Sequence, residues 1–142
     1  MATSPNETCL WLALYLIPGL GNAAFRSLVE TFGSAGEILR ADIKDLVCVK
    51  GIRREVARNI VDRRFSADPE MELREAEKAG GRVLIYTDAA YPAPLREIPH
   101  PPMVLYVRGR LLPGSDPMVA IVGSRNATHY GRKTAHRLAR GL

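Results

Sequence analysis

The sequence combines a glycine, a hydroxyl and a guanidinium in one short turn, Gly123-Ser124-Arg125. Glycine lets a ligand approach the backbone closely, Ser124 offers its hydroxyl and its N–H, and the planar fork of Arg125 suits a phosphate. A basic helix is expected after the turn, so the positive end of the helix dipole adds to the attraction. The turn predicts an anion site. The open alternative is a plain strand-to-helix turn with an exposed arginine.

Residues after the turn extend this candidate site. Thr128 can cap the helix or donate to the anion, and Gly131 lets the helix lie close to the preceding strand. From Val119 to Leu142 there are five Lys/Arg, two His and no acid, which adds Lys133 as a candidate phosphate contact. The turn has neither the Gly-x-Gly-x-x-Gly pattern nor a Walker loop, so a dinucleotide site is disfavoured.

Two domains are predicted around these residues. The sequence predicts a helical domain over residues 1–80, because helix-capping residues, apolar residues at helical spacing and glycines that end helices recur along this part. Residues 81–142 predict the beginning of an α/β domain, with short strands at Val83–Thr87 and Met103–Val107. Met118–Val122 predicts a third strand, continuously apolar and of the kind that is buried on both faces of a parallel sheet.

The helical part contains an internal repeat. Leu14-x-x-Ile17-Pro18-Gly19-Leu20 aligns with Leu46-x-x-Val49-Lys50-Gly51-Ile52 at an offset of 32 residues (51 − 19). Each copy resembles the helix-hairpin-helix motif, whose glycine hairpin offers backbone N–H groups to a nucleic-acid phosphate at a helix N-terminus. The first copy keeps both glycines of the motif, Gly19 and Gly21, whereas the second has Arg53 in place of the second glycine.

The second copy carries the positive charge. Residues 50–64 hold six Lys/Arg and two acids, and charge dominates the affinity for a nucleic-acid backbone. If either hairpin binds phosphate, we therefore expect the second, with secondary DNA contacts from Lys50, Gly51, Arg53, Arg54 and Arg58. The alternative is a tandem helical core without a ligand, as in sterile-alpha-motif (SAM)-like protein-interaction domains.

Composition narrows the function classes. The net charge of +5 suits a polyanionic partner. Cys9 and Cys48 stand alone, so neither a metal site nor a cofactor is expected. The apolar run Cys9–Ile17 is too short to span a membrane and has no basic leader, so we expect a cytoplasmic protein. Ser124 has no general base in its local sequence, and we expect no enzyme activity.

Three segments in this order identify a family resemblance. They are "LIPGLGNAAFRSLVETFGSAGEIL" from Leu16, "YPAPLREIPHPPMVLYVRG" from Tyr91, and "AIVGSRNATHYG" from Ala120. Together they resemble the DNA-processing protein A family (DprA, also called Smf). The resemblance implies that Gly123, Ser124 and Arg125 hold DNA phosphate, and that Thr128, Tyr130 and Gly131 complete the signature.

The resemblance also implies a fold and a function. The expected fold is a SAM-like helical domain followed by a Rossmann-like, doubly wound sheet. The expected function is binding single-stranded DNA, protecting it during natural transformation and helping to load the RecA recombinase, with homodimer formation in full-length members.

The family's sheet continues through further βα units. We therefore expect this chain to be an N-terminal fragment, and we do not expect full DNA affinity, dimerisation or RecA loading from the fragment alone. Two other functions stay open from the residues. One is a nucleotide-binding or nucleotide-hydrolysing Rossmann-like enzyme, and the other is a helical protein-interaction module.

Overall fold

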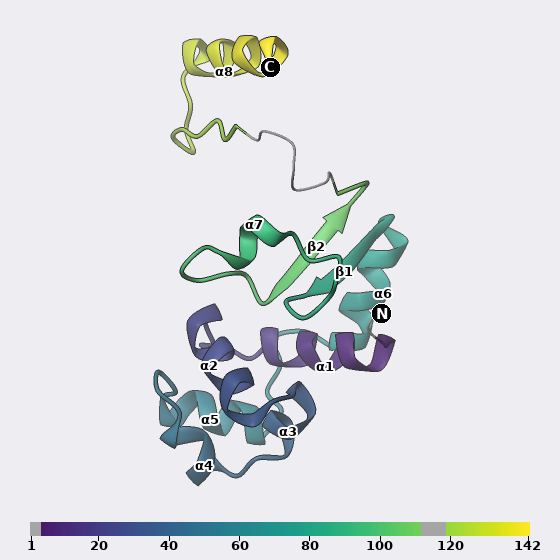
Figure 1. Ribbon diagram of the computed structural model, residues 1–142, viewed down its shortest axis with the longest axis vertical. Coiled ribbons are helices and arrows are strands. Elements are labelled where there is room, and N and C mark those ends of the chain that lie inside the picture. Colours follow the sequence, from purple (N-terminus) through teal and green to yellow (C-terminus); the bar gives the residue numbers. More distant parts are fainter. Residues whose placement is uncertain (1–3, 112–118) are drawn as a thin grey trace.

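The computed structural model describes residues 4–111 and 119–142, and it is helical apart from one small sheet (Figure 1). In chain order the elements are α1 (Pro5–Tyr15), α2 (Asn22–Phe32), α3 (Ala35–Arg40), α4 (Ile43–Cys48), α5 (Arg54–Val61), α6 (Pro69–Lys78), β1 (Gly81–Ile85), α7 (Ala93–Arg96), β2 (Val104–Arg108) and α8 (His129–Gly141). A run of helices followed by a short α/β segment is the order that the sequence predicts.

Short polar side chains start several helices as expected. The Oγ of Ser4 accepts a hydrogen bond from the N–H of Glu7 at 3.3 Å, and Ser34 does the same for Glu37 at 3.2 Å. The sequence also predicts that Asn22 caps the second helix, which is wrong, because Gly21 is the N-cap of α2. The Oδ1 of Asn22 instead accepts from the N–H of Met103 at 3.3 Å, which ties α2 to the residue before β2.

The predicted repeat is a structural repeat. Gly19 and Gly51 both have positive φ, +85° and +90°, a conformation that side-chain-bearing residues rarely adopt. A Cβ placed on Gly19 would lie 3.2 Å from Cγ2 of Val56, and one placed on Gly51 would lie 3.8 Å from Cβ of Ala24. Val56 and Ala24 are themselves one repeat apart (56 − 24 = 32). Each hairpin therefore packs against the equivalent position of the other copy, as in a pseudo-twofold pair.

The second glycine of the motif is not required by the backbone. Gly21 has φ −81° and ψ 162°, and Arg53 at the matching position has φ −82° and ψ 150°. Both are ordinary extended conformations that any residue adopts. The replacement of glycine by Arg53 therefore leaves the second hairpin with the geometry of the first.

Helix α5 is shorter than expected. The sequence predicts a helix from Arg53 to Phe65, but α5 ends at Val61, and Arg63 follows with φ +52°. The sequence also predicts that Val61 faces inward, but its side chain is 40% exposed, whereas Ile60 is fully buried. The buried side of α5 consists of Val56, Ala57 and Ile60, and Val61 does not lie on this side.

The two strands form an antiparallel pair whose register aligns Val83 with Tyr106. The sheet packs on α6 and α1. The Tyr106 hydroxyl donates to Oε1 of Glu72 on α6 at 3.0 Å, and burial together with that carboxylate raises the pKa of the Tyr106 phenol. One hydrophobic core runs from the helices into β1 and β2. The boundary at Gly80-Gly81 stays a prediction, and packing is continuous across it.

The predicted strand at Met118–Val122 is not formed where the structure describes it. Residue 118 lies outside the described residues. Residues 119–122 have no strand structure, and Val122 is 89% exposed. A strand needs a neighbouring strand for its backbone hydrogen bonds. In the described part of the chain, β1 and β2 pair only with each other. Residues 119–142 form a separate unit in Figure 1, of which α8 is the only regular element.

The N-terminus of α8 is capped by Thr128. Its Oγ1 accepts a hydrogen bond from the N–H of Gly131 at 3.1 Å, and the N–H of Arg132 bonds to the Thr128 carbonyl at 3.0 Å. A Cβ on Gly131 would lie 3.4 Å from that Oγ1, so glycine at this position leaves space for the capping hydroxyl. The prediction that Thr128 can cap this helix is confirmed.

Core truncations test the repeat packing. Ile60→Ala and its repeat equivalent Leu28→Ala each empty a fully buried site. We expect each to lower the free energy of unfolding by about 2–5 kcal/mol. Val61→Ala, one residue away on the exposed side, should cost about 0.5 kcal/mol or less. Urea unfolding curves measure all three, and an equal loss for Val61→Ala and Ile60→Ala would contradict this geometry of α5.

Removing the α8 cap tests the local structure of residues 124–131. Thr128→Ala deletes the acceptor for the Gly131 N–H, which we expect to weaken the first turn of α8 by about 1 kcal/mol. Amide hydrogen exchange at Gly131 should become faster. Thr128→Ser keeps the hydroxyl and should exchange like the native chain. Unchanged exchange in Thr128→Ala would show that the cap does not hold this helix start.

Candidate nucleic-acid interface

The predicted phosphate turn forms by local hydrogen bonding. Arg125 and Asn126 occupy the turn, and the Oγ of Ser124 accepts from the N–H of Asn126 at 3.3 Å. The hydroxyl hydrogen of Ser124 has no acceptor among the residues that the structure describes. Arg125 is exposed. A Cβ on Gly123 would meet nothing within 4 Å, so the space beside this glycine is open to a ligand.

Backbone donors point from the start of α8. The first N–H groups of a helix have no intrahelical acceptor. The Thr128 cap takes the N–H of Gly131. The N–H groups of His129 and Tyr130 have no partner in the described parts of the chain. These donors and the helix dipole together favour an anion at this end of α8.

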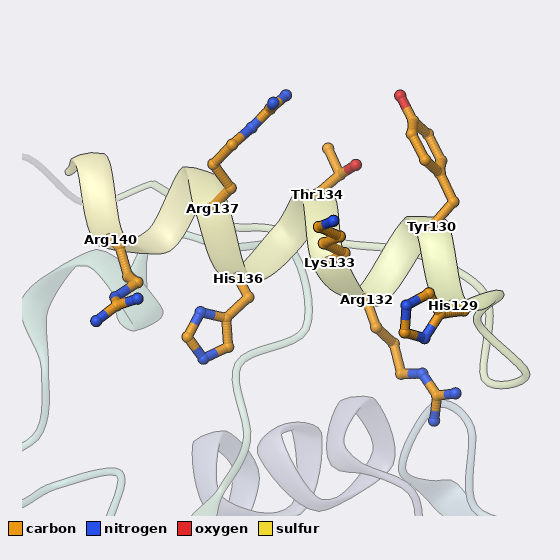
Figure 2. A pocket seen from close by; sticks show the side chains of 8 residues that line it. All are labelled: His129, Tyr130, Arg132, Lys133, Thr134, His136, Arg137 and Arg140. Carbon is orange, nitrogen blue, oxygen red and sulfur yellow. The ribbon is translucent and has the colours of Figure 1, made fainter.

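The outward surface of α8 is cationic. Figure 2 shows two rows of side chains along the helix, with Arg132, His136 and Arg140 in one row, Tyr130, Thr134 and Arg137 in the other, and Lys133 between them. No acid lies on α8, so none of these cations has a counter-charge on its own helix. All the residues that line this surface come from one helix, which makes it an open face and not an enclosed cleft.

The seven predicted site residues lie in three places. Gly123, Ser124, Thr128 and Gly131 line one hollow between the turn and the helix. Tyr130 and Lys133 lie on the outward face of α8. Arg125 is in the turn and lines neither surface. The structure thus brings four of the predicted residues together and leaves three on neighbouring exposed surfaces.

Sequence reasoning did not single out the other cations of this face, Arg132, Arg137 and Arg140. A signal for them was present. Arg132, His136 and Arg140 recur every four residues, a spacing that aligns side chains along one side of a helix. The number of charges in the segment shows an excess of cations. The four-residue spacing shows, in addition, which of these cations lie in one row along the helix.

The second predicted cluster lies on the other side of the fold, around the hairpin between α4 and α5. Lys50, Arg53, Arg54 and Arg58 are all exposed. The described ion pairs of this region join Arg64 to Asp62 and include none of these four. Nothing tests their assignment as DNA contacts, which stays a prediction.

Other kinds of site find little support among the described residues. No group of three His, Cys, Asp or Glu side chains there is placed to hold a metal ion. Cys9 is partly buried and Cys48 is exposed, and each is a free thiol. Burial raises the pKa of the Cys9 thiol, with a smaller contribution from nearby Glu70 and Asp68. No described helix has the length and apolar character needed to cross a membrane.

Two known families match separate parts of the chain. Residues 13–64 match the family of SAM-like tandem helix-hairpin-helix domains, and residues 82–142 match DNA recombination-mediator protein A. The first match confirms the predicted helical fold class, and the small sheet after it is consistent with the beginning of a Rossmann-like domain. No solved structure matches the chain significantly.

Individual relatives agree with the family matches. Protein Smf of Synechocystis sp. is 30% identical over 141 residues, which cover 96% of this chain and 35% of the relative. DNA processing protein DprA of Streptococcus pneumoniae is 31% identical over 106 residues, covering 75% of this chain and 35% of the relative. UvrABC system protein C of Alkaliphilus oremlandii is 41% identical over 57 residues, which cover 40% of this chain and 9% of that protein.

The chain spans about a third of the length of the Smf and DprA relatives. The Smf match takes in the helical repeat as well as the Gly-Ser-Arg turn, since it extends over nearly the whole chain. On these grounds the chain belongs to the DNA-processing protein A (DprA/Smf) family.

Proposed function

We propose that the protein to which this chain belongs is a single-stranded DNA-binding recombination mediator, and that the turn and α8 supply part of its phosphate contacts. One observation carries the proposal. The exposed turn and the outward face of α8 hold five Lys/Arg, two His and no acid, next to unpaired backbone donors at the helix start. A sequence-independent binder of nucleic acid needs this combination of cations and phosphate-directed donors.

An open face favours a polymer over a small nucleotide. A pocket for a small ligand normally encloses most of its surface. The α8 face is lined by one helix and extends along it, so it suits successive phosphates of a strand. The hydroxyl of Ser124 accepts from a backbone amide, and no histidine or carboxylate bonds to it among the described residues. These features support a protein that binds DNA without acting on it as an enzyme.

The remaining parts of the proposal concern the whole protein. The description of the matched family, DNA recombination-mediator protein A, supports a role in recombination. With the resemblance described above, it supports protection of incoming DNA in natural transformation, help in loading RecA, a homodimeric full-length protein and action in the cytoplasm. The turn and α8 would contribute DNA contacts to these activities.

Charge removal at the site tests DNA binding. In the chain of residues 1–142, Arg125→Ala and Lys133→Ala together should weaken binding to a fluorescently labelled single-stranded oligonucleotide. The slope of log affinity against log salt should fall by about 0.7 for each phosphate that the variant no longer neutralises. Fluorescence anisotropy across a salt series measures both effects.

The control variant is Arg82→Ala with Arg108→Ala, which removes two exposed cations from β1 and β2. It should leave affinity and salt slope near the native values. Equal weakening by both double variants would show that only net charge matters. Binding of a mononucleotide that does not respond to salt, or its turnover, would favour the enzyme alternative.

A further inference from the structure

The two histidines of α8 lie on the side of the helix that faces away from its apolar residues. The small and apolar residues recur at intervals of four, three and four, which places them on one side of the helix: Gly131, Ala135, Leu138 and Leu142. They line the hollows beside the segment that precedes α8. The same intervals, two residues earlier, connect His129, Lys133, His136 and Arg140. Two residues correspond to about 200° around an α-helix, so the second set lies opposite the first.

Cations surround both imidazoles. Four of them line the same outward face of α8, namely Arg132, Lys133, Arg137 and Arg140. In Figure 2, His129 and His136 point to the same side of the helix as Arg132 and Arg140. The described residues that line this face all belong to α8 and include no acid, and the one other titratable group among them is the Tyr130 phenol. Neither imidazole makes a hydrogen bond or an ion pair within the described parts of the chain.

The charge of this face depends on the protonation of its histidines. Imidazole is the side chain whose charge changes between about pH 5 and pH 8. When His129 and His136 both carry a proton, the turn and α8 gain two positive charges in addition to their five Lys/Arg. A DNA phosphate bound on the face attracts an imidazolium and also neutralises the cations that would repel it. Proton uptake and DNA binding must then strengthen each other, because the coupling between two binding events is reciprocal.

We propose that His129 and His136 make DNA binding by α8 depend on pH, with the protonated imidazoles acting as additional phosphate contacts. This inference rests on the proposed function, because it concerns the same face. His129 lies one turn from Lys133, and His136 lies one turn from Arg140. One turn of helix advances by about 5.4 Å, so a phosphate bound by either cation is within reach of an imidazole. DNA binding is therefore stronger at low pH and weaker at high pH.

The third histidine of the chain provides an internal control. The sequence contains three histidines, and His100 is exposed in the segment between α7 and β2. Its protonation adds the same charge to the molecule as protonation of His136, but it adds none to the face of α8. An effect of net charge would involve His100 as well. An effect of the α8 face requires His129 and His136 alone.

Binding measured on either side of the imidazole range tests the inference. Fluorescence anisotropy follows the chain of residues 1–142 as it binds a labelled single-stranded oligonucleotide, across a salt series at about pH 5.5 and about pH 7.5. We expect tighter binding at the lower pH. The slope of log affinity against log salt should be larger there by about 1.4, because each of two additional neutralised phosphates of a single strand contributes about 0.7.

Three variants assign the effect to residues. His129→Gln with His136→Gln removes both titrating groups, and its salt slope should be the same at the two pH values. His129→Arg with His136→Arg makes both charges permanent and should bind at the higher pH with the slope that the native chain has at the lower pH. His100→Gln should keep the native difference. Calorimetric titration in two buffers of different ionisation enthalpy counts the protons taken up on binding, which should fall to near zero in both double variants.

Three outcomes would overturn this inference and leave the proposed function standing. The first is native binding with the same affinity and salt slope at both pH values. The second is a pH difference that persists in His129→Gln with His136→Gln. The third is loss of the difference in His100→Gln, which would mean that net charge and not the α8 face is responsible. Absence of DNA binding at both pH values, in contrast, would overturn the proposed function of the turn and α8 together with the inference.

Discussion

The burial of α1 on all sides holds the described helices and the sheet together. Trp11, Leu12, Ala13 and Leu14 are consecutive and all buried, which requires partners around the whole helix. Those partners are α3, α6 and both strands, and the Trp11 and Phe25 rings meet with centroids 5.3 Å apart. Because α1 belongs to the repeat and also covers the sheet, the hairpins and the strands share one core. Any surface that binds DNA on the helical part is therefore fixed relative to β1 and β2.

The two copies of the pseudo-twofold repeat share a backbone geometry and differ in the charge of their exposed side chains. Gly19 and Gly51 approach the equivalent residues Val56 and Ala24 of the opposite copy, so neither hairpin can change its backbone without disturbing both. Side chains on the outside are under no such constraint. The second hairpin can therefore carry cations and the first hairpin can make packing contacts, while both keep the same backbone geometry.

Local signals in the sequence predicted local structure well. The caps formed by Ser4, Ser34 and Thr128 could be predicted because each hydrogen bond joins residues only three positions apart. The repeat could be predicted because its hairpins need glycine at the positions with positive φ. The predictions were wrong where contacts between residues distant in the sequence determine the structure. Asn22 bonds to Met103, 81 residues away, instead of capping its own helix. Residues 119–122 have the composition of a buried strand, but only a neighbouring strand could make them one.

The same distinction explains why the local structure of the turn and helix start could be predicted although the strand before them could not. The bond from the Asn126 N–H to Ser124 and the bond from the Gly131 N–H to Thr128 span two and three residues. They orient the turn and the start of α8 without help from any sheet. Ile121, Val122 and Leu138 are exposed and line an apolar hollow with Leu142, and Ile121 and Val122 also border the hollow beside the turn. The segment thus carries its phosphate-directed donors and cations on surfaces that its own short-range bonds define, while its apolar side has no such local determinant. The DNA contacts that we propose at this turn therefore depend on whether α8 keeps its cap and its charges, and less on how the apolar residues are covered.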